Sequence, residues 1–386
     1  MTRATAIAGI GATEFSKDSG RSELQLACEA VAAAIADAGL QPSDIDGLTT
    51  FTMDSSPEID VARNVGLGEL TFTSRVHYGG GAACATVAQA AMAVATGAAE
   101  VVVAYRAFNE RSGRRFGTGR SDWEPSAEGV GFSWYVPFGF MTPAAWVAMQ
   151  SAAYLHAAGA DGDDLGRVSV AARRHAATNP AAHFHGRPIT LDDHRASRPV
   201  VTPLRLLDCC QETDGGQAIV ITSAERARDL PHPPAVIVGA AQGSGDGQEQ
   251  MTSLQRGDLA VLDEAVVTAR HLWASTGLSA GDISTAVLYD HFTPYVLMQL
   301  EAYGFCRRGE AKDLVADGGI ELDGRLPVNT HGGQLGEAYL HGMNGVAEAV
   351  RQVRGTAVNQ VDEVEHVLVT AGTGVPTSAL VLGTDR

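Results

Sequence analysis

The sequence predicts an α/β fold made of two similar halves, because the same order of apolar strands and helices occurs twice along the chain. An apolar strand at residues 4–9 opens the first half, and a similar strand at residues 235–239 opens the second. The segment AGLQPSDID at residues 38–46 is echoed by TGLSAGDIS at residues 276–284. This shared order indicates a duplicated α/β core in which parallel strands lie between helices.

The helices of the two halves carry matching start and stop signals. Ser22 precedes the first helix, Gln25 stands at its capping-box position, and Gly39 ends it. Further along each half, a glycine-rich turn is followed by a helix and then by a buried strand. These segments are residues 78–81, a helix to Gly97 and strand 101–104 in the first half, and residues 331–333, a helix to Gly355 and strand 367–370 in the second.

The repeat divides the chain into three parts. We assign residues 1–104 and 200–230 to an N-terminal half and residues 231–386 to a C-terminal half. Residues 105–199 lack the repeat and are interpreted as an inserted loop domain. Ten aromatic residues lie between Tyr105 and Trp146. They form either the core of this insertion or, with Trp134, the wall of a pocket for a bulky apolar substrate.

Composition argues against several classes of protein. The net charge of −17 argues against nucleic-acid binding, because proteins that neutralise phosphates display a basic surface. No apolar run approaches the roughly 20 residues of a membrane-spanning helix, and the N-terminus lacks signal-peptide features, so we expect a cytoplasmic protein. Five cysteines without CxxC spacing indicate neither a disulfide framework nor a zinc site.

Arginines gather in one short segment of this acidic chain. They are Arg106, Arg111, Arg114, Arg115 and Arg120. Such a cluster suits the phosphates of a ligand such as coenzyme A, and Arg114 and Arg115 are the candidates for that contact. A solvated loop whose charges face water is an equally good interpretation.

Four motifs spread along the chain carry a resemblance to a known family. They are DCCQETDGG at residues 208–216, YDHFT at residues 289–293, LPVNTHGG at residues 326–333 and EAVRQVRG at residues 348–355. With the order of the segments, they resemble the thiolase superfamily, and specifically its sterol carrier protein x and lipid-transfer-protein branch. The resemblance implies the thiolase fold: two βαβαβαββ-type halves in a layered α/β/α/β/α arrangement, with the inserted loop domain between them.

The chain departs from this family at the positions that perform the chemistry. Gly80 stands at the position of the nucleophilic cysteine, and Cys84 lies one helical turn later. The two catalytic histidines of the family correspond to Tyr289 and Tyr339, and the C-terminal cysteine corresponds to Ala371.

These replacements remove both sulfurs that the covalent thiolase route would use at these positions. Acyl transfer in a thiolase requires a thiolate at a helix N-terminus, and neither glycine nor alanine can supply one. Tyrosine at both histidine positions, between intact glycines, indicates replacement chemistry. The chain most resembles the lipid-transfer-protein-like aldolases of steroid side-chain breakdown. That resemblance implies a β-hydroxyacyl-CoA with a tertiary alcohol on the steroid D ring, cleaved to a 17-ketosteroid and propionyl-CoA, with no cofactor beyond the coenzyme A of the substrate.

The residues themselves narrow the choice of aldolase mechanism. A Schiff base requires an activated lysine, but Lys17 and Lys312 are the two lysines of the chain and are expected to be exposed and far from the motifs. A metal-dependent aldolase requires clustered ligands, and the pair His183 and His185 has no evident third ligand, so we predict no metal site. Acid–base chemistry on a thioester is the route that remains.

We assign the roles within this route as hypotheses. Tyr339 is the base or relay at the substrate hydroxyl and Tyr289 the proton donor to the enolate, although the reverse assignment is nearly as good. Either a phenol has a lowered pKa, or it stays neutral and relays a proton through His291, whose pKa is expected near neutrality. His341 is structural or part of the relay. The predicted substrate and CoA contacts are Gly80, Gly332, Gly333, His341, Arg114, Arg115 and Trp134.

The resemblance also implies an assembly. A homodimer through the thiolase core is expected, joined by a small OB-fold partner with a zinc ribbon to give a heterotetramer. Two other function classes stay open at this point: a conventional or degenerate thiolase that uses Cys84, and a non-catalytic protein that binds acyl-CoA or lipid.

Overall fold

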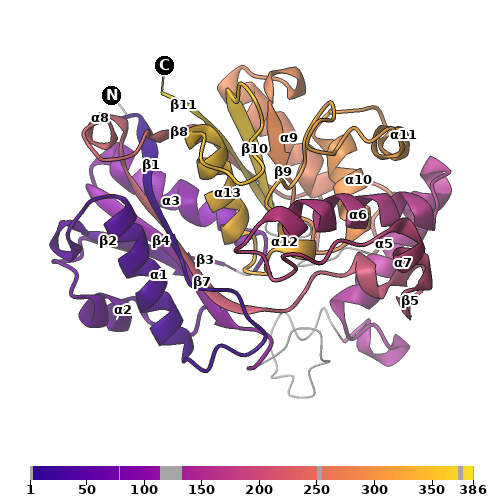
Figure 1. The fold of residues 1–386 in the computed structure, drawn as a ribbon, viewed down its shortest axis with the longest axis horizontal. Coiled ribbons are helices and arrows are strands. Elements are labelled where there is room, and N and C mark those ends of the chain that lie inside the picture. Colours follow the sequence, from indigo (N-terminus) through magenta and orange to yellow (C-terminus); the bar gives the residue numbers. More distant parts are fainter. Residues whose placement is uncertain (1–2, 78, 114–132, 250–253, 373–376, 386) are drawn as a thin grey trace.

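The computed structural model describes residues 3–77, 79–113, 133–249, 254–372 and 377–385. Nine strands of this part of the chain form one mixed sheet in the order β3-β2-β4-β7-β1-β8-β11-β10-β9 (Figure 1). Their bounds are β1 Thr5–Ala12, β2 Gly47–Phe51, β3 Phe72–Val76, β4 Val101–Asn109, β7 Asp214–Ser223, β8 Ala235–Gly243, β9 Thr285–Val287, β10 His366–Ala371 and β11 Thr377–Thr384. A short hairpin pairs β5 Pro199–Val201 with β6 Leu204–Arg205.

The predicted duplication appears in the strand order. The run β2-β4-β7-β1 of the first half is matched, in reverse order across the sheet, by β8-β11-β10-β9 of the second. The expectation of parallel strands is only partly right, because parallel pairing is confined to β2–β3, β2–β4 and β9–β10 among the described strands. Strands β10 and β11 are joined by a short connection, and short connections bring neighbouring strands together antiparallel.

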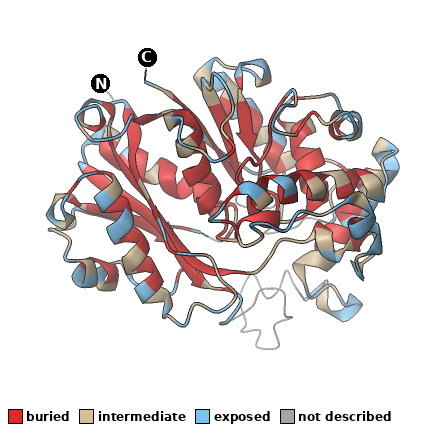
Figure 2. Cartoon of the chain, in the orientation of Figure 1, coloured by how far each residue is buried: buried red, intermediate tan, exposed pale blue. Residues whose placement is uncertain are grey.

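Helices cover and separate the two half-sheets, as three clusters of buried apolar side chains show. Helices α1 Glu23–Asp37 and α2 Glu58–Val65 pack on the outer face of the first half-sheet. Helices α3 Ala82–Thr96 and α13 Met343–Arg354 share one core with strands of both halves. Helices α9 Asp263–Thr276 and α10 Thr293–Ala302 cover the second half-sheet. The predicted order of layers is therefore present, and its central helices are largely buried (Figure 2).

The segment predicted to be an inserted loop domain is more regular than expected. Strand β4 continues to Asn109, and the segment then forms α5 Pro143–Ala158, α6 Gly162–Thr178 and α7 Leu191–Ala196. Helix α6 begins with a capping box between Asp161 and Asp164. Apolar residues of α5 and α6 join the core of the second half, so the insertion packs on that half. The boundaries assigned to the three parts of the chain stay a prediction.

Three short helices complete the described chain: α8 Ala224–Ala227, α11 Ala311–Ala316 and α12 Gly333–Gly336. The 3₁₀ turns are η1 Pro42–Asp44, η2 Val136–Phe138, η3 Leu206–Asp208 and η4 Ala280–Asp282. The turns η1 and η4 are the repeated segments noted in the sequence. In the residues that the structure describes, no helix has the length and apolar character needed to cross a bilayer.

The strands that join the two halves within the sheet pair through few residues, and one buried arginine reinforces this junction. Strands β1 and β8 pair through only Ala6–Val236 and Ile7–Ala235. Close to this junction, Arg354 of α13 is 4% exposed. It donates to Asp37 of α1 at 2.9 Å and to the carbonyl oxygen of Ala8 at 2.8 Å. A side chain of the second half therefore satisfies acceptors of the first.

Removal of this arginine tests the junction. Arg354→Ala is expected to lower the free energy of unfolding by about 2–4 kcal/mol, because the buried partners lose their donor. The matched control is Arg63→Ala, since Arg63 forms an exposed pair with Asp60 one helical turn away. That change is expected to cost less than about 0.5 kcal/mol. Urea denaturation measures both, and equal losses would contradict the role given to Arg354.

Candidate active site

Two tyrosines from separate motifs meet at the centre of the molecule. The hydroxyl oxygens of Tyr289 and Tyr339 lie 3.3 Å apart, within hydrogen-bond distance. Tyr289 is buried, whereas Tyr339 is partly exposed. The structure thus brings together the two residues that the sequence predicted to replace the thiolase histidines.

The backbone of Tyr289 is held at the end of β9 by three polar side chains. Its amide donates to Thr370 Oγ1 at 2.9 Å, and its carbonyl accepts from Gln299 Nε2 at 2.8 Å. Thr370 in turn donates to Gln299 Oε1 at 2.6 Å. Asn329 pairs with both backbone groups of the preceding residue, Leu288. Sequence reasoning did not find Thr370 or Gln299; polar side chains inside buried segments were the available signal.

Tyr339 is held by a residue of a different motif. Its amide donates to Thr213 Oγ1 at 2.9 Å, and the Thr213 hydroxyl donates to the Tyr339 carbonyl at 3.4 Å. Thr213 belongs to the DCCQETDGG segment that leads into β7. The rigid sheet of the first half therefore positions a side chain supplied by the second.

Gly80 makes room for the Tyr289 hydroxyl. A Cβ atom at residue 80 would lie 1.8 Å from that oxygen and 2.4 Å from the adjacent ring carbon. The phenol therefore fills the space that a side chain at residue 80 would take, and the resemblance predicts this to be the cysteine position of the family. Cys84 lies fully buried on α3, where its thiol contacts the Val369 carbonyl at 3.6 Å. Burial raises the pKa of Cys84, so this thiol is not a nucleophile.

Burial also sets the protonation of the tyrosine pair. It raises the pKa of both Tyr289 and Tyr339 well above the usual value for a phenol. The nearby carboxylate of Glu110 raises both pKa values further. Both phenols are therefore neutral at physiological pH, which favours the relay alternative over a lowered phenol pKa.

The neighbours of Tyr289 in the YDHFT motif have different environments. Asp290 accepts from the backbone amide of Gln334 at 2.7 Å and of Leu335 at 3.4 Å, so it caps α12. Burial raises the pKa of Asp290 to about 6. His291 packs against the Tyr289 and Tyr295 rings, with centroids 4.8 and 5.0 Å away. Burial lowers the pKa of His291 to about 3, so the expectation of a value near neutrality is wrong for the free protein.

His341 lies beside Tyr339, with ring centroids 5.0 Å apart, and adopts the left-handed backbone conformation with φ of 51°. Its Nδ1 accepts from Arg106 Nε at 3.2 Å. Arg106 is fully buried on β4 and forms an ion pair of 3.1 Å with Asp54. Since an arginine has no acceptor atom, Nδ1 of His341 carries no proton. Burial and Arg106 together lower the pKa of His341, which keeps it neutral.

The burial of Arg106 corrects one part of the sequence interpretation. This member of the arginine cluster cannot reach the phosphates of a ligand at the surface, because its charge is used inside the protein. A charged residue within the apolar run 101–108 was the signal for a buried pair. Arg114, Arg115 and Arg120 lie outside the described residues.

The other residues predicted to contact the substrate or CoA have different environments. Trp134 is 68% exposed, so in the described structure it does not wall an enclosed pocket. Gly332 and Gly333 have φ of 108° and 63°. A Cβ at Gly332 would meet the backbone of Ala176 at 2.8 Å, and one at Gly333 would meet Asp290 at 1.9 Å. The two glycines permit close packing of the motif loop.

The surroundings of the two lysines and of the His183 segment bear on the Schiff-base and metal-dependent mechanisms. Lys17 was expected to lie far from the motifs, and this expectation is wrong. Its ammonium group donates to Gln211 Oε1 at 3.0 Å and to the Glu212 carbonyl at 2.9 Å, both in the DCCQETDGG segment. Lys312 donates to the carbonyl oxygen of Gly159 at 2.9 Å. The backbone amide of His183 donates to the backbone carbonyl of Glu337 at 2.9 Å. Among the described residues, no group of three or more acidic, histidine or cysteine side chains is arranged to bind a metal ion.

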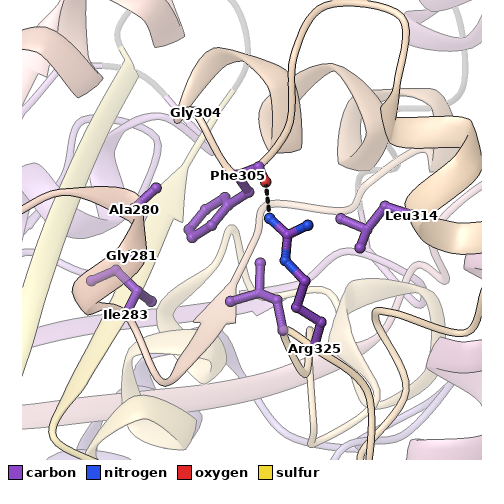
Figure 3. Close-up of a pocket in the computed structure, with 8 residues that line it drawn as sticks. Ala280, Gly281, Ile283, Gly304, Phe305, Leu314 and Arg325 are labelled. Carbon is purple, nitrogen blue, oxygen red and sulfur yellow. Dashed lines mark hydrogen bonds between the residues drawn. The ribbon is translucent and has the colours of Figure 1, made fainter.

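A separate pocket of about 230 Å³ lies on the second half and is lined by eight residues (Figure 3). Its lining includes Ile283, Phe305, Leu314 and Arg325. Arg325 points into it and donates to the Phe305 carbonyl at 2.6 Å. None of the predicted site residues lines this pocket, so it is distinct from the tyrosine site.

Gly80 can be tested by adding one carbon atom. Gly80→Ala is expected to lower kcat at least about 100-fold, because the new methyl group displaces the Tyr289 hydroxyl from its position. Gly162→Ala is the control, since a Cβ there meets nothing within 4 Å. Steady-state kinetics compares the two. Adding Tyr289→Phe to the Gly80→Ala variant removes the closest contact but leaves the ring carbon at 2.4 Å, so thermal stability is expected to recover only in part while activity stays lost.

The burial of His291 predicts a pH dependence of stability. Its folded pKa of about 3 lies below the unfolded value of roughly 6.5, so the unfolded state binds the proton first and stability falls as pH falls below 6.5. At pH 5 this one group accounts for a loss of about 2 kcal/mol relative to pH 7.5. His291→Gln is expected to remove that portion of the loss. His271→Gln, at an exposed residue, is expected to leave it unchanged. Urea denaturation at the two pH values decides between them.

Comparison with known proteins agrees with the fold and the motifs. Residues 245–384 match the family model described as thiolase C-terminal domain-like. The chain is 67% identical to the steroid side-chain-cleaving aldolase of Thermomonospora curvata, over 99% of this chain and 98% of that protein. It is 65% identical to the 17-hydroxy-3-oxo-4-pregnene-20-carboxyl-CoA lyase of Mycobacterium tuberculosis, over 98% of each.

Solved structures agree with this comparison of sequences. The structure described as Ltp2-ChsH2(DUF35) aldolase superposes with a TM-score of 0.96 at 66% identity, covering 99% of this chain and 98% of that one. Human mitochondrial 3-ketoacyl-CoA thiolase superposes with a TM-score of 0.70 over 100% of this chain and 99% of its own, and its 15% identity supports the fold alone. The chain therefore belongs to the thiolase superfamily, within the branch that contains the steroid side-chain-cleaving aldolases.

Proposed function

We propose that this protein is a carbon–carbon lyase that cleaves a β-hydroxyacyl-CoA by a retro-aldol reaction. The observation that carries the proposal is the pair of neutral phenols, 3.3 Å apart, in the space left by the missing side chain at Gly80. The names of the two relatives with 65–67% identity indicate the substrate class, a 17-hydroxysteroid carboxyl-CoA thioester whose side chain is cleaved. The proposal adds the products, a 17-ketosteroid and propionyl-CoA.

The reaction needs one proton removed and one delivered. Removal of the proton from the tertiary hydroxyl lets the oxygen form a ketone as the carbon–carbon bond breaks, and the electron pair passes to the thioester as an enolate. Tyr339, the more accessible phenol, takes the hydroxyl proton and passes its own to Tyr289 across the 3.3 Å contact, as Tyr289 gives up its proton. Tyr289 then donates a proton to the enolate carbon, which gives the short acyl-CoA.

The enolate requires hydrogen-bond donors at a fixed place. The Tyr289 hydroxyl lies next to Gly80, directly before the N-terminus of α3, where backbone amides and the helix dipole favour negative charge. This location supports Tyr289 as the residue on the enolate side of the reaction. Gly80, with Gly79 beside it, is the proposed contact for the thioester.

Two alternatives receive less support. A conventional thiolase would use Cys84, whose thiol is buried against Val369 with a raised pKa. A non-catalytic carrier leaves the convergence of two phenols and a buried carboxylate without a purpose. The predicted CoA contacts Gly332, Gly333, His341, Arg114, Arg115 and Trp134 remain part of the proposal, as does a reaction that needs no cofactor.

The proposal extends to the assembly. The similar solved structure pairs an Ltp2 aldolase with ChsH2(DUF35), so we propose that this chain also binds a DUF35 protein. A homodimer of this chain with two such partners, each an OB-fold with a zinc ribbon, gives the proposed heterotetramer. The cytoplasm is the proposed location.

Substitution of each phenol tests the mechanism in the complex with the DUF35 partner. Tyr289→Phe and Tyr339→Phe are each expected to lower kcat at least about 100-fold, since each removes one proton-transfer group. Tyr154→Phe is the control, because that buried phenol donates instead to Glu301, within the core of the second half. The assay follows ketone release from a tertiary β-hydroxyacyl-CoA.

Free coenzyme A distinguishes the classes of function. Turnover without added CoA is expected for the lyase, whereas a thiolase requires CoA as the acyl acceptor. Cys84→Ala is expected to retain activity. Near-normal turnover in both tyrosine variants, or a strict requirement for CoA, would overturn the proposal.

A further inference from the structure

Arg173 of α6 is a buried arginine that is not paired with an acidic side chain. It is 7% exposed, and its Nη2 donates to the carbonyl oxygen of Arg187 at 2.8 Å. Among the described residues, no carboxylate forms an ion pair with it, and its Nε has no hydrogen-bond partner. Burial of an unpaired charge is costly, which indicates a role for this guanidinium other than stabilising the fold.

A second arginine lies beside the first. The guanidinium carbons of Arg173 and Arg187 lie 3.6 and 4.8 Å from the centroid of one ring, that of Phe184. Arg187 is exposed, its Nη2 donates to the His183 carbonyl, and no carboxylate of the described chain pairs with it. Burial and the charge of Arg187 lower the pKa of Arg173 to about 10. An anion bound beside the two groups would offset their mutual repulsion.

A tight turn holds Arg187 against α6. The Arg187 amide donates to the Phe184 carbonyl at 3.0 Å, and the Gly186 amide donates to the Ala177 carbonyl of α6 at 2.9 Å. Gly186 has a φ of 69°, a backbone conformation that glycine adopts readily. The fold therefore keeps two like charges together, although an exposed loop could have let them separate.

This turn packs on the loop that leads to Tyr339. The amides of His183 and Phe184 donate to the carbonyls of Glu337 at 2.9 Å and Gly336 at 3.2 Å. Glu337 is two residues before Tyr339, so the Cα atoms of these two residues lie within about 8 Å of each other. Helices α6 and α12 are neighbours (Figure 1). The paired arginines therefore lie close to the loop that carries one of the phenols.

Lys17 of the first half reaches the same helix α12. It donates to Gln211, whose amide donates to the Gln334 carbonyl of α12 at 3.3 Å. Burial lowers the pKa of His183 to about 4, and the charges of Lys17 and the two arginines act in the same direction. Positive charge therefore gathers around α12 in a chain whose net charge is −17.

We propose that Arg173 and Arg187, together with Lys17, bind phosphate groups of the coenzyme A thioester. Guanidinium groups bind phosphate oxygens through paired hydrogen bonds, and Nε of Arg173 is a donor with no partner in the protein. The inference rests on the proposed function, because that reaction takes an acyl-CoA. Coenzyme A carries a diphosphate and a 3′-phosphate, so this site does not exclude a second contact by Arg114 and Arg115.

Titration of free coenzyme A into the complex with the DUF35 partner tests the site without turnover. Arg187→Gln is expected to raise the Kd measured by calorimetry at least about tenfold, because one charged donor is lost. Arg174→Gln is the matched control. Arg174 follows Arg173 on α6 but pairs with Glu321 at 2.8 Å, so its replacement is expected to leave the Kd within about twofold of wild type.

Buried Arg173 provides a second variant. Arg173→Gln is expected to raise the Kd for coenzyme A at least as much as Arg187→Gln does, because its guanidinium is the less hydrated of the two. Circular dichroism and thermal melting show whether this variant folds. If it does not fold, Arg187→Gln carries the test, since that side chain is exposed.

Steady-state kinetics separates failure of this inference from failure of the proposed function. Absence of cleavage of a tertiary β-hydroxyacyl-CoA by the wild-type complex would refute the function, whereas the titration examines the arginines directly. With an active wild type, Arg187→Gln is expected to raise KM at least about tenfold and to change kcat less than about threefold. The phosphates take no part in bond cleavage, so they are held equally in the ground state and the transition state.

Comparison of coenzyme A with 3′-dephospho-coenzyme A identifies the phosphate group. If the arginines hold the 3′-phosphate, wild type is expected to bind the dephospho form at least about tenfold more weakly, and Arg187→Gln has no further effect on that ligand. If they hold the diphosphate, Arg187→Gln weakens the binding of both ligands by the same factor. Either result supports the proposal.

Three results would overturn it. The first is a wild-type Kd for coenzyme A in Arg187→Gln and in folded Arg173→Gln. The second is a loss of affinity in Arg174→Gln as large as that in Arg187→Gln, which would assign the effect to general charge. The third is an unchanged Kd for coenzyme A together with weaker association with the DUF35 partner, which would make the arginines part of a protein interface.

Discussion

The absence of a side chain at Gly80 is the constraint on which the site depends. A Cβ there would overlap the Tyr289 hydroxyl, so the phenol and a nucleophilic cysteine cannot occupy this position together. The thiolase core offers one space at the start of its central helix, and in this chain a hydroxyl fills it. A side chain at residue 80 and the Tyr289 phenol in its present position are therefore mutually exclusive on the same backbone.

Many of the polar side chains around this space are buried. Arg106, Asp54 and His341 form a chain of buried contacts that orients one histidine, and Thr370 and Gln299 secure the backbone of Tyr289. Buried polar groups are stable only when each has a partner, so these networks tolerate few substitutions. Their rigidity keeps two hydroxyls at a separation suited to proton transfer.

The sequence predicted the duplication and the two tyrosines because both are local signals. Repeated strand, turn and helix segments can be recognised from a few consecutive residues. Tyr289 and Tyr339 can be recognised because the motif residues around them are otherwise unchanged from the family pattern. The insertion was underestimated because α5 is rich in alanine and lacks a clear apolar face, although Pro143 and Gly159 mark its ends. Mixed strand directions escaped prediction because apolar periodicity does not report the direction of pairing.

The electrostatics of the site could not be predicted for a different reason. The contact between Arg106 and His341 joins residues that are 235 positions apart in the sequence. The burial of His291 depends on the aromatic rings of Tyr289 and Tyr295 that pack against it. A reference pKa describes a group in water, whereas each of these groups is removed from water by residues distant in the chain. The expectation for His291 was therefore wrong by several pH units, while the identity of the residue near the tyrosines was right.

The pairing of β1 with β8 is short, so the geometry of the site depends on more than the sheet. Gly80 and Arg106 belong to the first half, whereas both phenols belong to the second. The core that α3 and α13 share with strands of both halves therefore fixes the distances between these groups. A substitution deep in that core changes the alignment of the site without altering any residue that belongs to it.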